Sequence, residues 1–222
     1  MKMKTKMKRI LALVATILCF FRPILAVASD SNEDDEFSLR KAALASWNGQ
    51  PISYFVQDSE DGWRKASLWH SPDTNWFVSE YVVDSDSKYY SVVDGVLYSK
   101  DMSQLLLFPP MKEIWYFQVP SCVHEISDVA FMGSYYLRDL VITDSVTSFG
   151  EELGCDLFYE SRVETIYFPN SPTLNIHIDG FAYMPCVQKI VVPRDSPLAE
   201  RFMEVDQSGY LCLVSSGVVR FY

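Results

Sequence analysis

Three six-residue stretches decide the fold of this chain: LRDLVI at residues 137–142, VETIYF at 163–168 and VQKIVV at 187–192. Each has an apolar residue at its first, fourth and sixth position, and their starts lie 26 and then 24 residues apart. Such a period lies in the range of leucine-rich repeats, where each unit lays one short strand beside the last. Because one unit alone cannot bury its apolar face, neighbouring units stack and share a core.

The repeat extends well beyond these stretches. The three units cover residues 119–142, 143–168 and 169–192. Pro120, Pro169 and Pro193 recur at their boundaries, and proline ends a strand because it has no N–H for the ladder. We expect parallel strands, stacked in register, at 140–142, 166–168 and 190–192. The side chains expected to be largely buried are Leu137, Leu140, Ile142, Val163, Ile166, Phe168, Val187, Ile190 and Val192, together with Phe131, Phe158 and Phe181.

The stretch VPSCVHEISDVAFMGSYYLRDLVITDSVTSFG, residues 119–150, resembles the BspA-like leucine-rich repeats of bacterial surface proteins. The resemblance covers residues 89–211 and weakens in the third repeat, where the V-x-x-I spacing is missing. It implies a protein of the cell surface or the extracellular space that binds proteins or other macromolecules, and it does not imply an enzyme. Together with the repeat period, we expect a β-rich solenoid, a short leucine-rich-repeat array with parallel strands, preceded by a small antiparallel β unit and a short helix.

The first 28 residues have the marks of a secretory signal peptide. A basic head precedes the apolar run 10–21, and Ala26-Val27-Ala28 offers a small-residue cleavage site. The alternative is an uncleaved anchor, but a spanning helix needs roughly 20 apolar residues, and this run is shorter. We therefore expect a secreted or cell-surface protein with no transmembrane segment after cleavage.

The charge of the chain limits its partners. The net charge is −10, and cleavage after residue 28 removes six basic residues and no acidic one, which leaves −16. Nucleic acids and anionic membranes need a positive face, so both are disfavoured as partners. The polar acidic segment 29–36 has nothing to bury and is expected to be disordered.

The rest of the chain divides by composition. Residues 37–88 are expected to form an α/β cap or small domain, with a helix over 37–47 and strands at 51–57, 65–70 and 76–83. Residues 89–118 form a hairpin unit, because Asp94-Gly95 between two apolar runs is a strong turn signal. The repeats span 119–192, and a C-terminal cap covers 193–222.

Motifs for catalysis, metal binding and nucleotide binding are missing from the sequence. The three histidines are scattered, and neither G-x-S-x-G nor a P-loop is present, so we expect no enzyme activity and no cofactor. The cysteine spacings match no zinc site, and we expect no metal. Disulfide formation stays open for the four cysteines beyond residue 28. These are Cys122, Cys155, Cys186 and Cys212.

The third and fifth positions of the six-residue pattern should point outward from the sheet. These positions hold Asp139, Val141, Thr165, Tyr167, Lys189 and Val191. Val141, Tyr167 and Val191 would then form an apolar row with a polar rim, which is typical of a contact surface. The alternative is that residues 29–88 or another copy of the chain cover this row and make it core.

A second class of function also stays open. Residues 37–88 could hold a cell-wall or carbohydrate-associated hydrolase, since sequence alone leaves room for a carboxylate pair such as Glu80 with Asp58. The same segment is rich in aromatic residues, which form either a core or a sugar-stacking platform. The main hypothesis remains a non-catalytic binding or adhesion module, because no nucleophile and base are visible.

Overall fold

The computed structural model describes residues 50, 52–68, 75–149, 157–171, 174–176, 186–207 and 216–222. Its contacts divide the chain into one unit of Met1–Ala42 and a second of Ala43–Tyr222, and all described residues belong to the second. The expected signal peptide, the acidic segment 29–36 and the helix at 37–47 therefore lie outside the described residues, as does Phe181.

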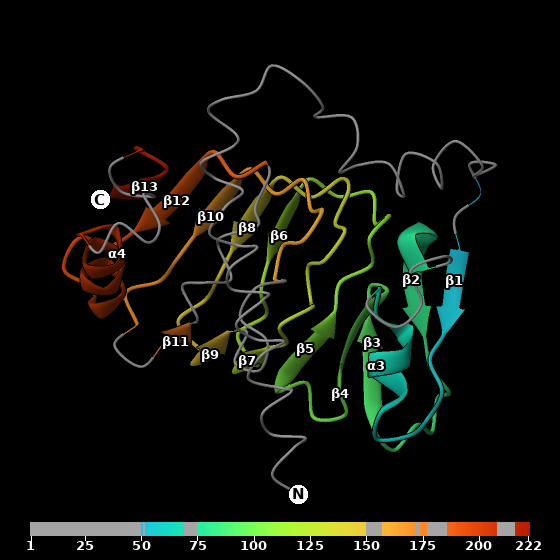
Figure 1. Cartoon of the computed structure of the whole chain (residues 1–222). Helices are drawn as coiled ribbons and strands as arrows, with labels where there is room; N and C mark the ends of the chain where they lie inside the picture. The colour runs from blue at the N-terminus through green and yellow to red at the C-terminus, as the bar shows by residue number, and fades with distance from the viewer. Residues whose placement is uncertain are drawn as a thin grey trace, which may run out of the picture. The chain divides into compact units, whose positions relative to one another are not determined.

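A five-stranded parallel sheet runs through the repeats, with the strand order β13-β12-β10-β8-β6 (Figure 1). Its strands are β6 (Tyr116–Gln118), β8 (Asp139–Val141), β10 (Thr165–Tyr167), β12 (Lys189–Val192) and β13 (Val219–Phe221). Leu140, Ile166 and Ile190, the fourth residues of the three sequence patterns, lie side by side in register. The prediction of stacked parallel strands is confirmed, with each strand beginning one residue earlier than expected.

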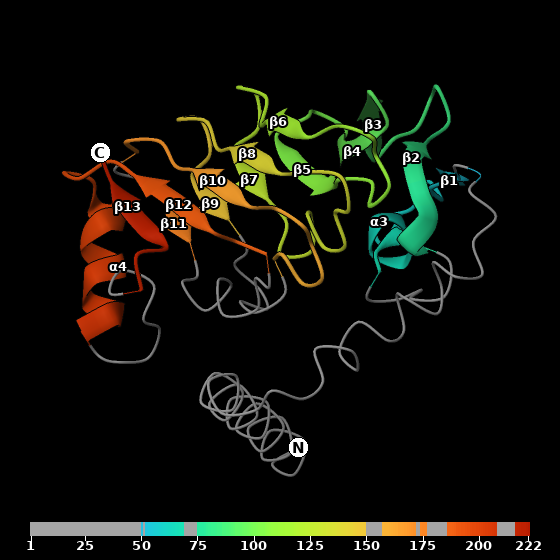
Figure 2. The same cartoon turned by 90° about the horizontal axis from the view of Figure 1, so that it is seen from above.

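The opposite side of each turn carries a second, shorter strand that the six-residue pattern did not predict. These strands are β7 (Glu125–Ile126), β9 (Ser148–Phe149) and β11 (Asn175–Ile176), and they pair in parallel. They continue through β5 (Gln104–Leu107), β4 (Val96–Ser99) and β3 (Tyr90–Val93) into one six-stranded sheet. The two sheets face each other, which makes the β-rich solenoid that the sequence predicted (Figure 2).

The apolar core lies between the two sheets and contains the positions expected from the pattern. Leu137, Leu140, Val163, Ile166, Ile190 and Val192 are completely buried, and Ile142 and Phe168 are nearly so. Phe131 and Phe158 are also buried, and their rings stack.

Val187 is the exception, because it is only partly buried. Aligned on the pairing of Ile190 with Val219, Ser216 takes the position of the pattern that Val187 holds in its own unit. The unit after Val187 therefore has a small polar residue at a position where the earlier units have an apolar one.

Both ends of the repeats are closed by other elements. The β3–β4 hairpin turns at Asp94 and Gly95, whose φ values of 49° and 75° are those that a tight two-residue hairpin requires. After β12, the helix α4 (Pro197–Gln207) places Leu198 and Phe202 in the core.

The N-terminal part of the described chain differs from the sequence prediction at one element. The strands β1 (Ile52–Phe55) and β2 (Val78–Val82) form where strands were expected and pair in parallel, and a 3-10 turn, Asn75–Phe77, precedes β2. The strand expected at 65–70 is wrong, because the helix α3 (Gly62–Ala66) occupies its start. Asp61 lies one helical turn before Lys65, and their ion pair of 3.1 Å favours the turn.

Candidate binding surface

The outward side of the five-stranded sheet brings the predicted site residues together in two rows. Asp139, Thr165 and Lys189 are direct neighbours on adjacent strands, and all three are half-buried. Their neighbour on β6 is Tyr116, which is 43% exposed. The first row therefore consists of polar and charged side chains with one aromatic side chain at its end.

The second row has fewer exposed side chains than the sequence predicted. Val141, Tyr167 and Val191 are neighbours as expected, but Val191 is only 9% exposed, whereas Tyr167 is 37% exposed. The expectation that Val191 is exposed is therefore wrong, whereas the use of this row for binding stays a prediction. The strand β13 continues the sheet beyond β12 and sets Arg220 beside Val191, whereas the pattern had placed the edge of the sheet at β12.

Cations lie close to the aromatic side chains of this face. The Lys189 ammonium lies 5.9 Å from the centre of the Tyr167 ring, and the Arg162 guanidinium lies 4.0 Å from that of Tyr135. Such contacts hold a ring in one orientation and contribute about 0.5–1 kcal/mol at exposed sites. Tyr167 is thus a partly fixed aromatic side chain, which is the type that commonly anchors an interface.

A shallow hollow of about 410 Å³ opens where the strands of this sheet end. It is lined by Ser121, Val141, Ile142, Thr143, Asp144, Ser145, Tyr167, Phe168, Pro169 and Tyr222. Two of the predicted residues, Val141 and Tyr167, form part of its wall, and Tyr222 adds a ring that is 69% exposed. Apolar walls with a few hydroxyl and carboxylate groups suit a ligand that has both apolar and polar parts.

The sequence analysis missed the contribution of β6. Trp115 and Tyr116 are 68% and 43% exposed at the end of the sheet, yet residues 89–118 had been treated as a hairpin unit. The signal was present, because Ile114, Phe117 and Val119 occupy the first, fourth and sixth positions of the same pattern. This copy of the pattern starts 23 residues before Leu137, upstream of the first full repeat.

The structure gives the two carboxylates of the alternative site separate contacts. Glu80 lines a hollow of about 480 Å³ beside the hairpin and accepts a hydrogen bond from the Ser53 hydroxyl, whereas Asp58 is not part of that lining. Asp58 accepts hydrogen bonds from the Ser87 hydroxyl at 2.5 Å and from the Lys88 and Tyr89 N–H groups. The Ser87 hydroxyl and then the Lys88 N–H lower the pKa of Asp58. A carboxylate held in this way fixes a loop and is a weak base.

Asp58→Asn is expected to lower the melting temperature at neutral pH, because a carboxylate accepts these hydrogen bonds better than an amide does. The pKa of Asp58 is lowered from 3.8 in the fold, so its contribution is complete above 3.8 and is lost as the pH falls through the folded value. The difference in melting temperature between Asp58→Asn and the wild type should therefore disappear below about pH 4. Glu60→Gln, at an exposed neighbour, is the control, and a gap that widens in acid would contradict this role.

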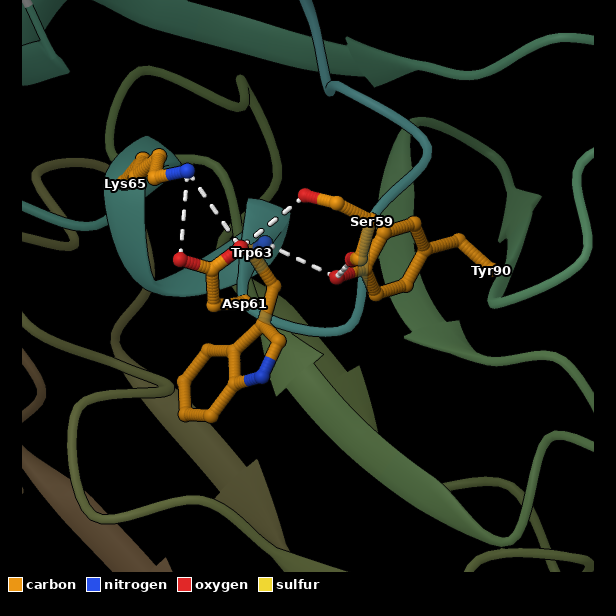
Figure 3. Close-up of polar contacts among 5 residues, drawn as sticks. All are labelled: Ser59, Asp61, Trp63, Lys65 and Tyr90. Atoms are coloured by element: carbon orange, nitrogen blue, oxygen red, sulfur yellow. Dashed lines mark hydrogen bonds and ion pairs between the residues drawn. The ribbon is translucent and has the colours of Figure 1, made fainter.

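The aromatic residues of the N-terminal part mostly form a core. Trp76, Tyr81 and Tyr90 are 7%, 3% and 2% exposed, and burial raises the pKa of the Tyr81 hydroxyl. The Tyr90 hydroxyl accepts a hydrogen bond from the backbone N–H of Trp63 at 3.1 Å and donates one to the Ser59 carbonyl (Figure 3).

The same close-up shows the neighbouring ion pair between Lys65 and Asp61 and the hydrogen bond that Asp61 accepts from Ser59. The Trp63 ring points away from these polar contacts, and the residue is half-buried. These rings and charges hold a turn together and do not form a flat sugar-stacking platform. Trp69, which belongs to the same aromatic segment, lies outside the described residues.

The described residues also show where the candidate metal ligands and two of the cysteines lie. Within those residues, no group of three or more His, Cys, Asp or Glu side chains is placed to hold a metal ion. Cys122 and Cys186 are free thiols, and Cys155 and Cys212 lie outside the described ranges. Likewise, none of the described helices has the length and apolar character needed to span a membrane.

Three solved structures resemble this chain, although no family model and no curated protein sequence matches it. The pneumococcal vaccine antigen PcpA is 21% identical over 51% of this chain and 33% of its own, with a TM-score of 0.37. A leucine-rich cell surface protein of Faecalibacterium prausnitzii A2-165 is 23% identical over 55% and 37%, with a TM-score of 0.39. A leucine-rich-repeat protein of Eubacterium ventriosum ATCC 27560 is 17% identical over 64% and 42%, also with a TM-score of 0.39. This chain spans less than half the length of each.

Proposed function

We propose that this chain is an exported leucine-rich-repeat module that binds a protein or another surface macromolecule without catalysing a reaction. The observation that carries the proposal is the outward side of the five-stranded sheet. There Tyr167, half-exposed and flanked by Lys189, forms part of the wall of the hollow that Tyr222 also lines.

Three further features support this proposal over the hydrolase alternative. The strands hold the outward side chains in fixed register, which pre-organises a contact surface and lowers the entropy lost on binding. Asp58 and Glu80 serve separate local contacts and do not share one hollow. The basic and apolar N-terminal segment has the pattern typical of a secretory signal peptide, which supports a secreted or cell-surface location as part of the same proposal.

The test is the variant Tyr167→Asp. It sets a charge where an apolar ring meets a partner, so binding should fall at least about tenfold, as expected for an aromatic anchor. Because the ring is 37% exposed, the melting temperature should change little. The full chain and its variants are screened against arrays of glycans and of purified cell-surface proteins, and affinities are measured for each ligand that binds the wild type.

Tyr89→Asp is the matched control, since Tyr89 is 44% exposed on the hairpin unit and lies outside the five-stranded sheet. Its binding should equal that of the wild type. A ligand lost with Tyr89→Asp and kept with Tyr167→Asp would move the site to the N-terminal part. Loss of folding in Tyr167→Asp would mean that the row is structural.

A further inference from the structure

The strand β6 forms an open edge of the five-stranded sheet. It is the last strand in the sheet order, and among the strands that the structure describes it pairs only with β8. The Trp115 carbonyl accepts a hydrogen bond from Asp139 N–H at 2.9 Å, and Val119 N–H donates to the Val141 carbonyl at 3.0 Å. Since successive residues of a strand direct their backbone groups to opposite sides, Tyr116 and Gln118 direct theirs away from β8.

These four backbone groups are accessible. No hydrogen bond joins the N–H or C=O of Tyr116 or Gln118 to any other described residue. Tyr116 is 43% exposed, its neighbour Trp115 is 68% exposed, and Gln118 is exposed as well. The units before β6 add their strands β3, β4 and β5 to the other sheet, so the position beside β6 stays empty among the described strands. Natural proteins usually block such an edge with a proline, a lysine or a covering element.

Two carboxylates lie close to this edge. Asp139 lies directly across from Tyr116 on the outward side, and Glu113 is exposed just before β6. Of the nearby cations, Arg138 forms an ion pair with Glu164 at 3.1 Å, and the Lys112 ammonium is bound at the hairpin turn, where it donates to the Asp94 carbonyl. Two copies joined through this edge would bring like charges together in a chain of net charge −10, which disfavours self-pairing.

We propose that β6 binds an extended, positively charged segment of a partner protein, which adds a sixth strand to the five-stranded sheet. The incoming backbone would exchange hydrogen bonds with Tyr116 and Gln118, which is strand addition at a sheet edge. Its outward basic side chains would lie near Asp139 and Glu113, and the Tyr116 ring would pack beside them. This site goes beyond the proposed function, because β6 lies two strand spacings, about 10 Å, from β10 and Tyr167.

The experiment uses the full chain and two blocked eight-residue peptides, one of alternating lysine and valine and one of alternating glutamate and valine. Binding is followed by NMR, together with amide hydrogen exchange of residues 116–118. The lysine peptide should bind and slow exchange of the Tyr116 and Gln118 amides, whereas the Phe117 amide, on the β8 side, should not change. The glutamate peptide should bind at least tenfold more weakly.

The decisive pair of variants is Gln118→Pro and Gln118→Ala. Both remove the hydrogen bond from the Tyr116 hydroxyl to the Gln118 side chain, but only proline removes the outward N–H and blocks the edge with its ring. Because that N–H takes no part in the ladder to β8, both variants should melt at the same temperature. Gln118→Pro should bind the lysine peptide at least tenfold more weakly than Gln118→Ala.

Several results would overturn the proposal. These are equal binding by the two variants, equal binding of the two peptides, or no protection of the Tyr116 and Gln118 amides at millimolar peptide. A dimer in ultracentrifugation that Gln118→Pro dissociates would assign the edge to a second copy instead. Tyr167→Asp should bind the lysine peptide as the wild type does. A failure of the proposed site at β6 is therefore distinguishable from a failure of the proposed binding surface around Tyr167.

Discussion

Phe131→Ala is expected to lower the free energy of unfolding by about 3–5 kcal/mol, the usual cost of truncating a fully buried phenylalanine. Phe131 has no exposed surface, and its ring stacks on Phe158 with centres 5.9 Å apart. It also contacts Phe108 and Phe117, so it joins the hairpin unit, the strand β6 and the repeats. The neighbouring rings are held by two sheets and cannot collapse into the space that the variant leaves.

The measurement is urea unfolding of the full chain followed by fluorescence and circular dichroism. Phe55→Ala is the control, because Phe55 is 57% exposed, and its substitution should cost well under 1 kcal/mol. If the two variants lose equal stability, Phe131 does not lie in a shared core and the packing described above is wrong.

Gly133→Ala is the second substitution with a large expected effect. Gly133 has a φ of 72°, in the left-handed region, where a side chain costs about 1–2 kcal/mol. A methyl group there would also lie 2.5 Å from Leu68 Cδ1 and 2.8 Å from Trp76 Cζ3, two buried side chains of the N-terminal part. Overpacking of this kind costs about 1–3 kcal/mol. The combined loss should therefore be roughly 2–5 kcal/mol.

The same unfolding assay tests this substitution, with Gly217→Ala as a matched control. Gly217 has a φ of 80°, but nothing lies within 4 Å of the position that its methyl group would take. Gly217→Ala should therefore show the backbone cost alone, and the difference between the two variants should report the packing against Leu68 and Trp76. Equal losses would mean that the N-terminal part does not pack on the turn that holds Gly133.

The core of the repeats could be predicted because period and burial depend on the same residues. A six-residue pattern with apolar residues at fixed positions leaves one way to bury them all, which is to stack the strands in register. The Asp94-Gly95 turn was equally clear, since few residue pairs accept two positive φ angles.

The ends of the solenoid were harder to predict, because their strands carry weaker versions of the pattern. The strand β6 keeps the pattern but sits before the first full repeat, and β13 has Ser216 where the other units have an apolar residue. The C-terminal residues were expected to form short strands of a cap, whereas β13 joins the five-stranded sheet beside β12. That difference explains the error at Val191, which would be exposed if β12 were the edge of the sheet. Exposure of an outward residue depends on the next strand, which the residue's own repeat does not encode.

The short helix α3 was mistaken for part of a strand for a different reason. The strand prediction rested on composition in a window that begins at Lys65, and the helix begins three residues earlier at Gly62. Its stability comes from Asp61 and from burial of Ala66 against the N-terminal core, which are tertiary and side-chain effects. Short elements of this type are decided by their surroundings more than by propensity.

Consecutive repeats stack in register and so present one ordered outward face. The most direct test is NMR detection of scalar couplings across individual hydrogen bonds in the full chain. Couplings should join the Ile142 amide nitrogen to the Tyr167 carbonyl carbon and the Phe168 nitrogen to the Val191 carbonyl carbon, because both hydrogen bonds are 2.9 Å long. Couplings from these nitrogens to other carbonyl groups, or to strands of another sheet, would contradict the solenoid and with it the proposed binding face.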